Sequence, residues 1–254
     1  MAFALLFDST HCIGCRACEE GCAGKWNHPY DETIAAEDHL SAHKLTAVQT
    51  FQAGGEERYN RRLCMHCEEP TCVSACPVTA LEKTAEGPVV YHESRCIGCR
   101  YCMQACPFQV PSYEWHKRLP RIKKCDLCIE RQTAGQKTAC TEACPADATL
   151  SGTREEMIAE AKRRIAENPD GYYPHIYGLT EVGGTSVFFL SAVPFEQLGM
   201  NTGLPHEALP PLTWRALSAV PGVAAVGSVL LGGIYWITHR REEVAAAEGK
   251  EKGR

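Results

Sequence analysis

The chain has 254 residues, a formal net charge of −5 and sixteen cysteines. Its length allows one or two domains. The acidic balance, without a basic run or a platform of aromatic side chains, argues against binding to nucleic acid. The sequence also lacks a glycine fingerprint for nucleotides, a nucleophile paired with a base and the signature of a substrate pocket, so we expect no catalytic residues. The chemistry must therefore lie with the cysteines.

The cysteines fall into four groups of four. They are Cys12, Cys15, Cys18 and Cys22 (motif I), Cys64, Cys67, Cys72 and Cys76 (motif II), Cys96, Cys99, Cys102 and Cys106 (motif III), and Cys125, Cys128, Cys140 and Cys144 (motif IV). Motifs I and III follow the spacing C-x2-C-x2-C-x3-C, and proline follows the last cysteine of every motif except motif I. This is the ligand spacing of bacterial [4Fe–4S] clusters, in which the fourth cysteine serves the other cluster of a pair. Four motifs predict four clusters and hence a path for electrons.

Three other interpretations of the cysteines remain open. Eight disulfides would suit a short secreted scaffold, which has no need for repeated C-x2-C pairs. Zinc sites would explain such pairs, but not the third cysteine two residues later or the proline after the fourth. A mixed set, with one cubane replaced by another type of cluster, is the third alternative.

An internal repeat indicates how the motifs are arranged. Leu5-Leu6-Phe7 precedes motif I and Val89-Val90-Tyr91 precedes motif III, and each apolar run is typical of a short strand. We therefore expect an α+β fold over residues 1–150, with two pseudo-repeated ferredoxin-like units that hold two cubane clusters each and an insertion at 26–62. Because metal binding supplies folding free energy, we expect the apo chain to be unstable.

Charged residues near the motifs have two possible roles. We expect basic side chains to offset the negative charge of the clusters, with simple surface exposure as the alternative; they are Arg16, Arg95, Arg100, Lys123 and Lys124. We expect Glu19 and Glu20 to lower the potential of the motif I cluster relative to that of motif III. We interpret His28, His39 and His43 as ordinary polar residues, and we expect His66 to lie near a cluster or at the surface without ligating iron.

The region after motif IV predicts a helix and a strand. Thr153 and Glu156 form a capping box, and the helix that follows should stop near Asn168. The run from Gly183 to Leu190 predicts a turn followed by a strand. We expect residues 151–203 to pack on the cluster domain and the proline-rich residues 204–215 to form a linker.

Residues 216–238 predict a transmembrane helix, with a buried soluble helix as the alternative. They contain no charged side chain, and at about 1.5 Å per residue they would cross a hydrocarbon core of about 30 Å. His239-Arg240-Arg241 begins a charged tail at 239–254, so the positive-inside rule predicts a cytoplasmic C-terminus and a periplasmic cluster domain at the inner membrane. The first seven residues are too short and uncharged for a signal peptide, so we expect export with a partner that carries a twin-arginine signal.

Together, these features resemble the four-cluster iron–sulfur (beta) subunits of respiratory oxidoreductases, in particular those of membrane-bound formate dehydrogenases and hydrogenase-2-type nickel–iron hydrogenases. The resemblance covers nearly the whole chain and includes the stretches Cys64–Cys67, Cys96–Cys102 and Tyr173–Thr185. It implies a non-catalytic subunit that relays electrons between a molybdenum, tungsten or nickel–iron catalytic subunit and a membrane subunit that binds haem or quinone. A stand-alone membrane-anchored polyferredoxin and a zinc-binding scaffold remain as alternatives.

The resemblance also implies which cysteines would ligate each cluster. The sets are Cys12, Cys15, Cys18 and Cys144 for cluster 1; Cys125, Cys128, Cys140 and Cys22 for cluster 2; Cys64, Cys67, Cys72 and Cys106 for cluster 3; and Cys96, Cys99, Cys102 and Cys76 for cluster 4.

Overall fold

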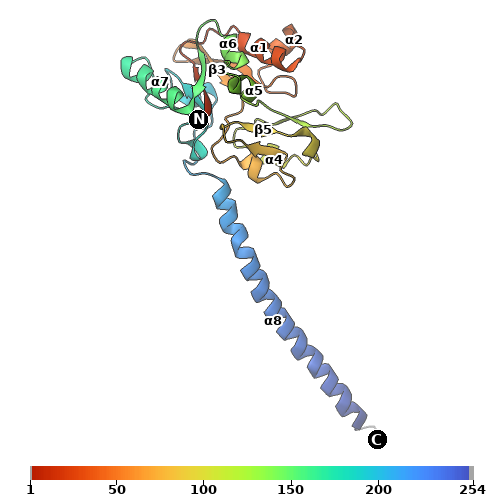
Figure 1. Ribbon diagram of the computed structural model, residues 1–254. Coiled ribbons are helices and arrows are strands. Elements are labelled where there is room, and N and C mark those ends of the chain that lie inside the picture. Colours follow the sequence, from red (N-terminus) through yellow and green to blue (C-terminus); the bar gives the residue numbers. More distant parts are fainter. Residues whose placement is uncertain (1, 252–254) are drawn as a thin grey trace. The chain divides into compact units, whose positions relative to one another are not determined.

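The computed structural model describes residues 2–251. It divides into two compact units, Met1–Leu209 and Pro210–Arg254. Figure 1 shows that the first unit contains the strands and the short helices, whereas the second is a single long helix. All sixteen cysteines lie in the first unit.

The first strand lies at the centre of a three-stranded sheet. β1 (Phe3–Asp8) pairs antiparallel with β8 (Thr149–Thr153) and parallel with β9 (Val187–Leu190), which gives the order β8-β1-β9. The expected strand before motif I and the expected strand up to Leu190 are both confirmed. The parallel pairing is the unexpected part, because it brings a late segment of the chain beside the first strand.

Both faces of this sheet are buried. Successive side chains of a strand point to opposite faces. On one face, Leu5 and Phe7 join a core that also contains Cys18 and Cys140. On the other face, Leu6 joins a second core with side chains of the long helix that follows β8. The sheet therefore separates the cysteine motifs on one face from that helix on the other.

That helix is α7 (Arg154–Glu167). The Thr153 hydroxyl accepts the backbone N–H of Glu156 at 3.3 Å, and the Glu156 carboxylate accepts the backbone N–H of Thr153 at 2.8 Å, which is the predicted capping box. Met157 and Ala161 are buried on the side that faces the sheet. The helix ends directly before the stop that the sequence predicts.

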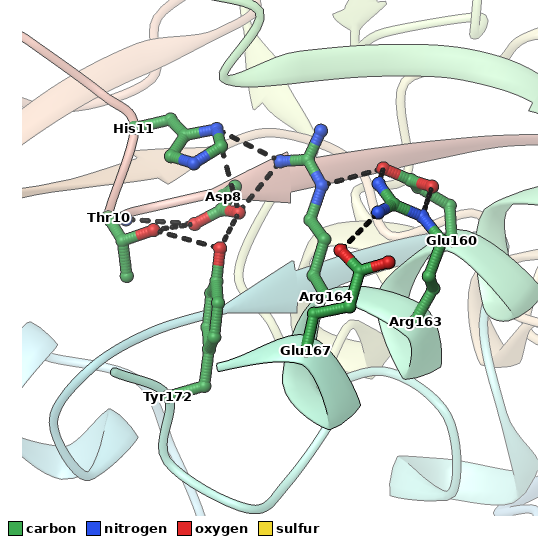
Figure 2. Close-up of polar contacts among 8 residues, drawn as sticks. All are labelled: Asp8, Thr10, His11, Glu160, Arg163, Arg164, Glu167 and Tyr172. Atoms are coloured by element: carbon green, nitrogen blue, oxygen red, sulfur yellow. Dashed lines mark hydrogen bonds and ion pairs between the residues drawn. The ribbon is translucent and has the colours of Figure 1, made fainter. Parts of the chain in front are cut away.

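A buried carboxylate fastens α7 to the end of β1 (Figure 2). One oxygen of Asp8 accepts hydrogen bonds from Arg164 at 2.7 Å and from the Tyr172 hydroxyl at 2.8 Å. The other accepts from the hydroxyl of Thr10 at 2.6 Å and from its backbone N–H at 2.9 Å. Because Cys12 follows Asp8 closely in the sequence, these contacts fix the start of the motif I loop.

Short elements support the other motifs. β4 (Leu81–Lys83) pairs antiparallel with β5 (Val89–Tyr91), which confirms the expected strand before motif III, and β6 (Ser112–Tyr113) pairs with β7 (Ile122–Lys123). The helices near the cysteines are α1 (Ala17–Trp26), α3 (Thr71–Ser74), α4 (Tyr101–Ala105), α5 (Ile129–Thr133) and α6 (Ala139–Glu142). Three 3-10 turns complete the unit: η1 (Glu93–Arg95), η2 (Glu181–Gly183) and η3 (Phe195–Leu198). In Figure 1, α1 and α6 lie together, and α4 lies near β5 in another part of the same unit.

The backbone repeats where the sequence repeats. Four pairs of corresponding positions adopt left-handed conformations, with φ between +47° and +71°. Residues other than glycine rarely adopt this region, so its recurrence indicates that the two halves follow the same path around their cysteines. The pairs are Gly14 and Gly98, Arg16 and Arg100, His66 and Leu127, and Thr79 and Asp147.

The segment expected only as an insertion, 26–62, contains a helix and a hairpin. α2 (Glu32–Ala36) is followed by β2 (Ala47–Ala53) and β3 (Glu56–Arg62), which pair antiparallel. Gly54 and Gly55 form the tip with φ of +64° and +81°. Two glycines between strand-forming runs are a hairpin signal, so the sequence did contain the information for this element.

The second unit is α8 (Pro210–Glu251). It includes the uncharged stretch at 216–238 and continues beyond it at both ends. The linker expected at 204–215 is therefore wrong in its second half, since only 204–209 precede the helix. Proline is tolerated in the first turn of a helix, where its missing N–H has no intrahelical partner, which explains why Pro210 and Pro211 begin α8. By length and composition, Pro210–Ala245 is able to cross a membrane.

Candidate iron–sulfur centres

The first unit contains four recesses, and four cysteines line each of them. They are recess 1 with Cys12, Cys15, Cys18 and Cys144; recess 2 with Cys22, Cys125, Cys128 and Cys140; recess 3 with Cys64, Cys67, Cys72 and Cys106; and recess 4 with Cys76, Cys96, Cys99 and Cys102. Each recess combines three cysteines of one motif with one cysteine of another, and so brings together one of the four sets named above. All sixteen cysteines are free thiols, so the disulfide interpretation is wrong.

Glycines allow the loops around recesses 1 and 4 to turn tightly. Gly14 and Gly98 occupy equivalent positions and have φ of +69° and +71°. A Cβ atom on Gly14 would collide with the ring of Tyr59, and one on Gly98 would lie 2.8 Å from the Tyr113 hydroxyl. Both positions therefore require glycine, for the backbone conformation and for the close approach.

Backbone N–H groups point at cysteine sulfurs in three of the recesses. The N–H of Ala80 donates to Cys76 Sγ at 3.2 Å, and that of Leu127 donates to Cys125 Sγ at 3.3 Å. Equivalent contacts reach Cys96 from Gly98 at 3.4 Å and Cys106 from Val110 at 3.5 Å. Such donors stabilise a negatively charged sulfur.

The recesses suit a multi-atom cluster better than a single ion. Within residues 2–251, no three His, Cys, Asp or Glu side chains are grouped closely enough to share one metal ion. Sulfurs spread around a common space are the arrangement that a [4Fe–4S] cubane requires.

Comparison with known proteins identifies the family. Residues 56–154 match the 4Fe-4S dicluster domain. The chain is 38% identical to the hydrogenase-2 operon protein HybA of Escherichia coli O157:H7, over 91% of this chain and 84% of that protein. It is 40% identical to a protein of Nitratidesulfovibrio vulgaris, over 98% of this chain and 70% of the relative. It is also 38% identical to the iron–sulfur subunit of the nitrate-inducible formate dehydrogenase of E. coli K12, over 74% of this chain and 67% of that subunit.

The chain belongs to the family of iron–sulfur subunits of formate dehydrogenase- and hydrogenase-type complexes. It is an electron-transfer subunit of a respiratory complex and not itself a catalyst. This membership confirms the family resemblance and sets aside the stand-alone polyferredoxin and the zinc-binding scaffold.

Burial makes the thiols of this iron–sulfur subunit difficult to ionise. It raises the pKa of Cys18, Cys22 and Cys72 to about 12, and that of Cys102 to about 11. The thiolate, however, is the form that ligates metal. The recesses therefore need positive charge, from iron when a cluster is bound and from basic side chains of the protein.

A fully buried guanidinium supplies such charge between recesses 1 and 2. Arg61 Nε donates to the Thr46 hydroxyl at 2.7 Å, and Nη1 donates to the Thr149 hydroxyl at 3.1 Å. Burial alone would raise the pKa of Cys140, but Arg61 and a neighbouring hydroxyl hold it below its usual value. Arg61 also interacts electrostatically with Cys18 of recess 1. Sequence reasoning missed this residue because it lies in the insertion.

Three of the five basic residues singled out from the sequence line a recess. Arg16 lines recess 1, Arg100 lines recess 4 and Lys124 lines recess 3. The Lys124 ammonium is buried and donates to two backbone carbonyls, at 2.5 and 2.8 Å. Lys123 instead pairs with Glu93 at 3.1 Å. Arg95 is largely exposed, beside an acidic residue of β4.

The acidic residue next to Cys18 is neutralised. The Glu19 side chain is buried and pairs with Lys44 at 2.8 Å. It also accepts hydrogen bonds from the Val48 backbone N–H at 2.5 Å and from the Tyr30 hydroxyl at 2.7 Å. Lys44 therefore offsets part of the charge of Glu19, and the expected lowering of the potential by Glu19 and Glu20 stays a prediction.

Neighbouring recesses share buried cores or close charges. Cys18 of recess 1 and Cys140 of recess 2 belong to the same core. Cys125 of recess 2 interacts electrostatically with Cys64 of recess 3. Recess 3 is followed by recess 4, because a further core contains one cysteine of each.

Proposed function

We propose that this subunit conducts single electrons through four [4Fe–4S] clusters in the order 1, 2, 3 and 4. The observation that carries the proposal is the series of four neighbouring recesses, each lined by four cysteines of two motifs. A bound cluster supplies a one-electron couple whose potential depends on its surroundings. The protein holds each cluster with thiolates, excludes water with the buried cores, and balances charge with side chains such as Arg61.

The sixteen cysteines are assigned as iron ligands on the same basis. Motifs I and IV exchange their last cysteines, Cys22 and Cys144, and motifs II and III exchange Cys76 and Cys106. Each exchange joins two half-sites, so the cysteine-bearing unit consists of two ferredoxin-like units over residues 1–150, with the insertion at 26–62 and a further segment at 151–203 packed on them. The recurrence of left-handed φ values at matched positions supports this division.

Serine variants test the exchange without assuming it. If Cys144 serves the motif I cluster, Cys144→Ser and Cys15→Ser will abolish the same electron paramagnetic resonance (EPR) signal in the reduced holoprotein. Cys22→Ser and Cys128→Ser will abolish a second signal. If Cys144→Ser instead removes the signal lost in Cys128→Ser, each motif keeps its own four cysteines and the assignment is wrong.

Metal content tests the number and type of clusters. Four cubanes require about sixteen iron atoms per chain. Iron, acid-labile sulfide and zinc are measured on the purified complex and on the partner subunits without this chain, and the difference is assigned to this subunit. A stoichiometric zinc content would contradict the proposal. An iron content well below sixteen with fewer EPR signals would reduce the number of clusters, or show that one belongs to another type.

The ends of the series suit two different partners. We infer that a catalytic subunit of the molybdenum, tungsten or nickel–iron type delivers electrons at one end, and that a membrane subunit with haem or quinone receives them at the other. The relatives named for hydrogenase-2 and formate dehydrogenase support this inference. Native mass spectrometry of the complex extracted in mild detergent identifies the partners, and a chain that always emerges alone would contradict it.

We further propose that α8 anchors the subunit in the inner membrane as a single span. The uncharged residues 216–238 would lie in the bilayer, and the basic residues 239–241 would keep the tail at 239–254 in the cytoplasm, which leaves the cluster domain in the periplasm. Fusions at the C-terminus test the orientation. We expect a fluorescent protein to be active there and alkaline phosphatase, which requires the periplasm, to be inactive; the reverse result would contradict the orientation.

A further inference from the structure

Within the described residues, three buried side-chain atoms have no hydrogen-bond partner. They are His66 Nε2, Thr84 Oγ1 and Tyr91 Oη. A buried polar group without a partner destabilises a protein, so each of these atoms needs an explanation. His66 lines recess 3 and Tyr91 lines recess 4. Two of the three unpartnered atoms therefore belong to residues that line a proposed cluster site.

The contacts of His66 determine which nitrogen carries the proton. The imidazole is buried, and Nδ1 lies 2.9 Å from the backbone N–H of Val89. That N–H is a donor, so Nδ1 accepts and the ring proton is on Nε2. The unpartnered atom is therefore a donor, and it belongs to a residue between two of the cysteines that line recess 3.

Tyr91 presents a donor in recess 4. It is the last residue of β5, and its hydroxyl lies beside Cys96, where the two groups interact electrostatically. The hydroxyl is buried, with the Cys96 sulfur and the Ile122 backbone beside it, and neither contact has the geometry of a hydrogen bond within the described chain. The chemical group available to it is the sulfur-rich content of the recess.

The corresponding positions in the other half carry apolar side chains. Phe7 occupies the position of Tyr91 in the internal repeat, and it lines recess 1. Leu127 occupies the position of His66, lines recess 2, and has a similar φ of +57° against +48°. The two donors are thus confined to one half of the repeat, although the backbone around them is the same in both halves.

We propose that His66 Nε2–H and Tyr91 Oη–H donate hydrogen bonds to sulfur atoms of the clusters held in recesses 3 and 4 and thereby raise the potentials of these clusters. The proposal rests on the proposed function, since it requires clusters in both recesses. Reduction adds a negative charge to a cluster, and a hydrogen bond to the more negative form stabilises that form. His66 and Tyr91 would not be iron ligands, but residues that tune the clusters through their sulfurs.

Tyr91→Phe is the sharpest test, because it removes one oxygen and recreates the residue found at Phe7. The midpoint potentials are measured by EPR-monitored redox titration of the holoprotein in its complex. We expect one cluster to become about tenfold harder to reduce, which is about 59 mV for a one-electron couple, while the other three stay unchanged. Tyr113→Phe is the matched control, because that hydroxyl lies near the same loop but already donates to the Gly98 carbonyl at 3.2 Å; it should shift none of them.

His66→Leu tests the other donor, and Leu127 shows that leucine is compatible with this backbone conformation. We expect a negative shift of a different cluster from the one that responds in Tyr91→Phe. In protein labelled with ¹⁵N-histidine, pulsed EPR should detect a nitrogen coupled to the reduced cluster, and His66→Leu should abolish this coupling. The coupling is attributable because His66 is the single histidine among the described residues that line the four recesses.

The outcomes separate this inference from the proposed function. If the unmodified protein lacks four clusters, the proposed function fails first. If four clusters are present and neither variant moves a midpoint, or if the labelled protein shows no histidine coupling, the inference alone is overturned. Should His66→Leu lose iron, the labelled unmodified protein still decides the role of His66, and Tyr91→Phe decides that of Tyr91.

Discussion

The two halves of the cysteine-bearing unit place the same kind of motif in different electrostatic surroundings. In the half with recesses 1 and 2, the Arg61 guanidinium lies beside Cys140, and the ion pair of Lys44 with Glu19 is buried next to motif I. In the half with recesses 3 and 4, the buried ammonium of Lys124 donates to two backbone carbonyls and acts on Cys72, and His66 and Tyr91 occupy positions that carry apolar residues in the other half. The same cysteine spacing in both halves therefore does not imply that the clusters bound there would have the same redox potentials.

The halves also differ in what surrounds their loops. The half with recesses 1 and 2 contributes the β8-β1-β9 sheet, which α7 covers on its other face and against which Met65 of the second half also packs. The second half relies on two-stranded hairpins with strands of two or three residues. Isolated two-stranded hairpins are marginally stable in water, so we expect the second half to depend more strongly on bound clusters.

Removing the iron should have the largest effect and should affect the halves unequally. Chelation under reducing conditions is expected to unfold the loops of both halves, because cluster binding is folding free energy. The sheet and α7 should persist longest. Limited trypsin digestion followed by mass spectrometry checks this, with cuts expected first in the segment from Arg95 to Lys124 and later in α7. Simultaneous cleavage of both segments would show that the halves unfold as one.

Loss of the buried guanidinium should come next. Arg61→Leu leaves negative sulfurs of two recesses without their shared cation, and breaking a buried charge pair destabilises by about 3–5 kcal/mol. We expect iron loss confined to the first half and a lower Tm of the holoprotein. Arg62→Leu is the control, because its guanidinium is only partly buried and donates to the Phe108 carbonyl at 3.1 Å. Full retention of iron and an unchanged Tm in Arg61→Leu would refute this view of the first half.

The attachment of α7 should matter less than Arg61 but remain measurable. Arg164→Met leaves the buried carboxylate of Asp8 without its cation, and we expect a loss of about 3 kcal/mol in the free energy of unfolding. Figure 2 also shows the control on the same helix: Arg163 pairs with Glu160 and Glu167 at the surface. Arg163→Met should leave Tm unchanged within error. Equal Tm values for the two variants would contradict a structural role for the Asp8 contacts.

The smallest effect concerns the potential of cluster 1. Glu19→Gln alone leaves Lys44 unpaired and should raise the potential of that cluster, because a buried positive charge remains near it. The double variant Glu19→Gln/Lys44→Met removes both charges and should leave the potential close to that of the unmodified protein. Redox titration of the two variants decides between them. A large shift in the double variant would show that the pair does not cancel.

Much of this structure was predictable from local sequence patterns. The strands at β1 and β5, the capping box of α7 and the apolar run of α8 depend on neighbouring residues, and all are where the sequence places them. The hairpin of β2 and β3 was also predictable, from Gly54 and Gly55. The boundary at Pro210 was missed because proline usually marks a linker, although the first helical turn accepts it.

The remaining features depend on contacts between distant parts of the chain. Nothing local to β9 indicates that it pairs in parallel with β1. The sequence around Arg61 is typical of a surface residue in an insertion. Only the folded hairpin of β2 and β3 places its guanidinium beside Cys140. The partner of Glu19 is a lysine far along the chain, so its charge cannot be judged from motif I alone. His66 Nε2 and Tyr91 Oη stand out because they are buried without a hydrogen-bond partner in the described structure. Sequence patterns do not show whether a side chain has such a partner.

The central position of β1 has a consequence for biosynthesis. The sheet beside recesses 1 and 2 is incomplete until Leu190 has left the ribosome, and recess 1 also needs Cys144, whereas recesses 3 and 4 draw only on cysteines between Cys64 and Cys106. During translation, all the cysteines of recesses 3 and 4 are therefore made before the cysteines of motif IV that complete recesses 1 and 2. The first motif to be made is therefore among the last to be completed.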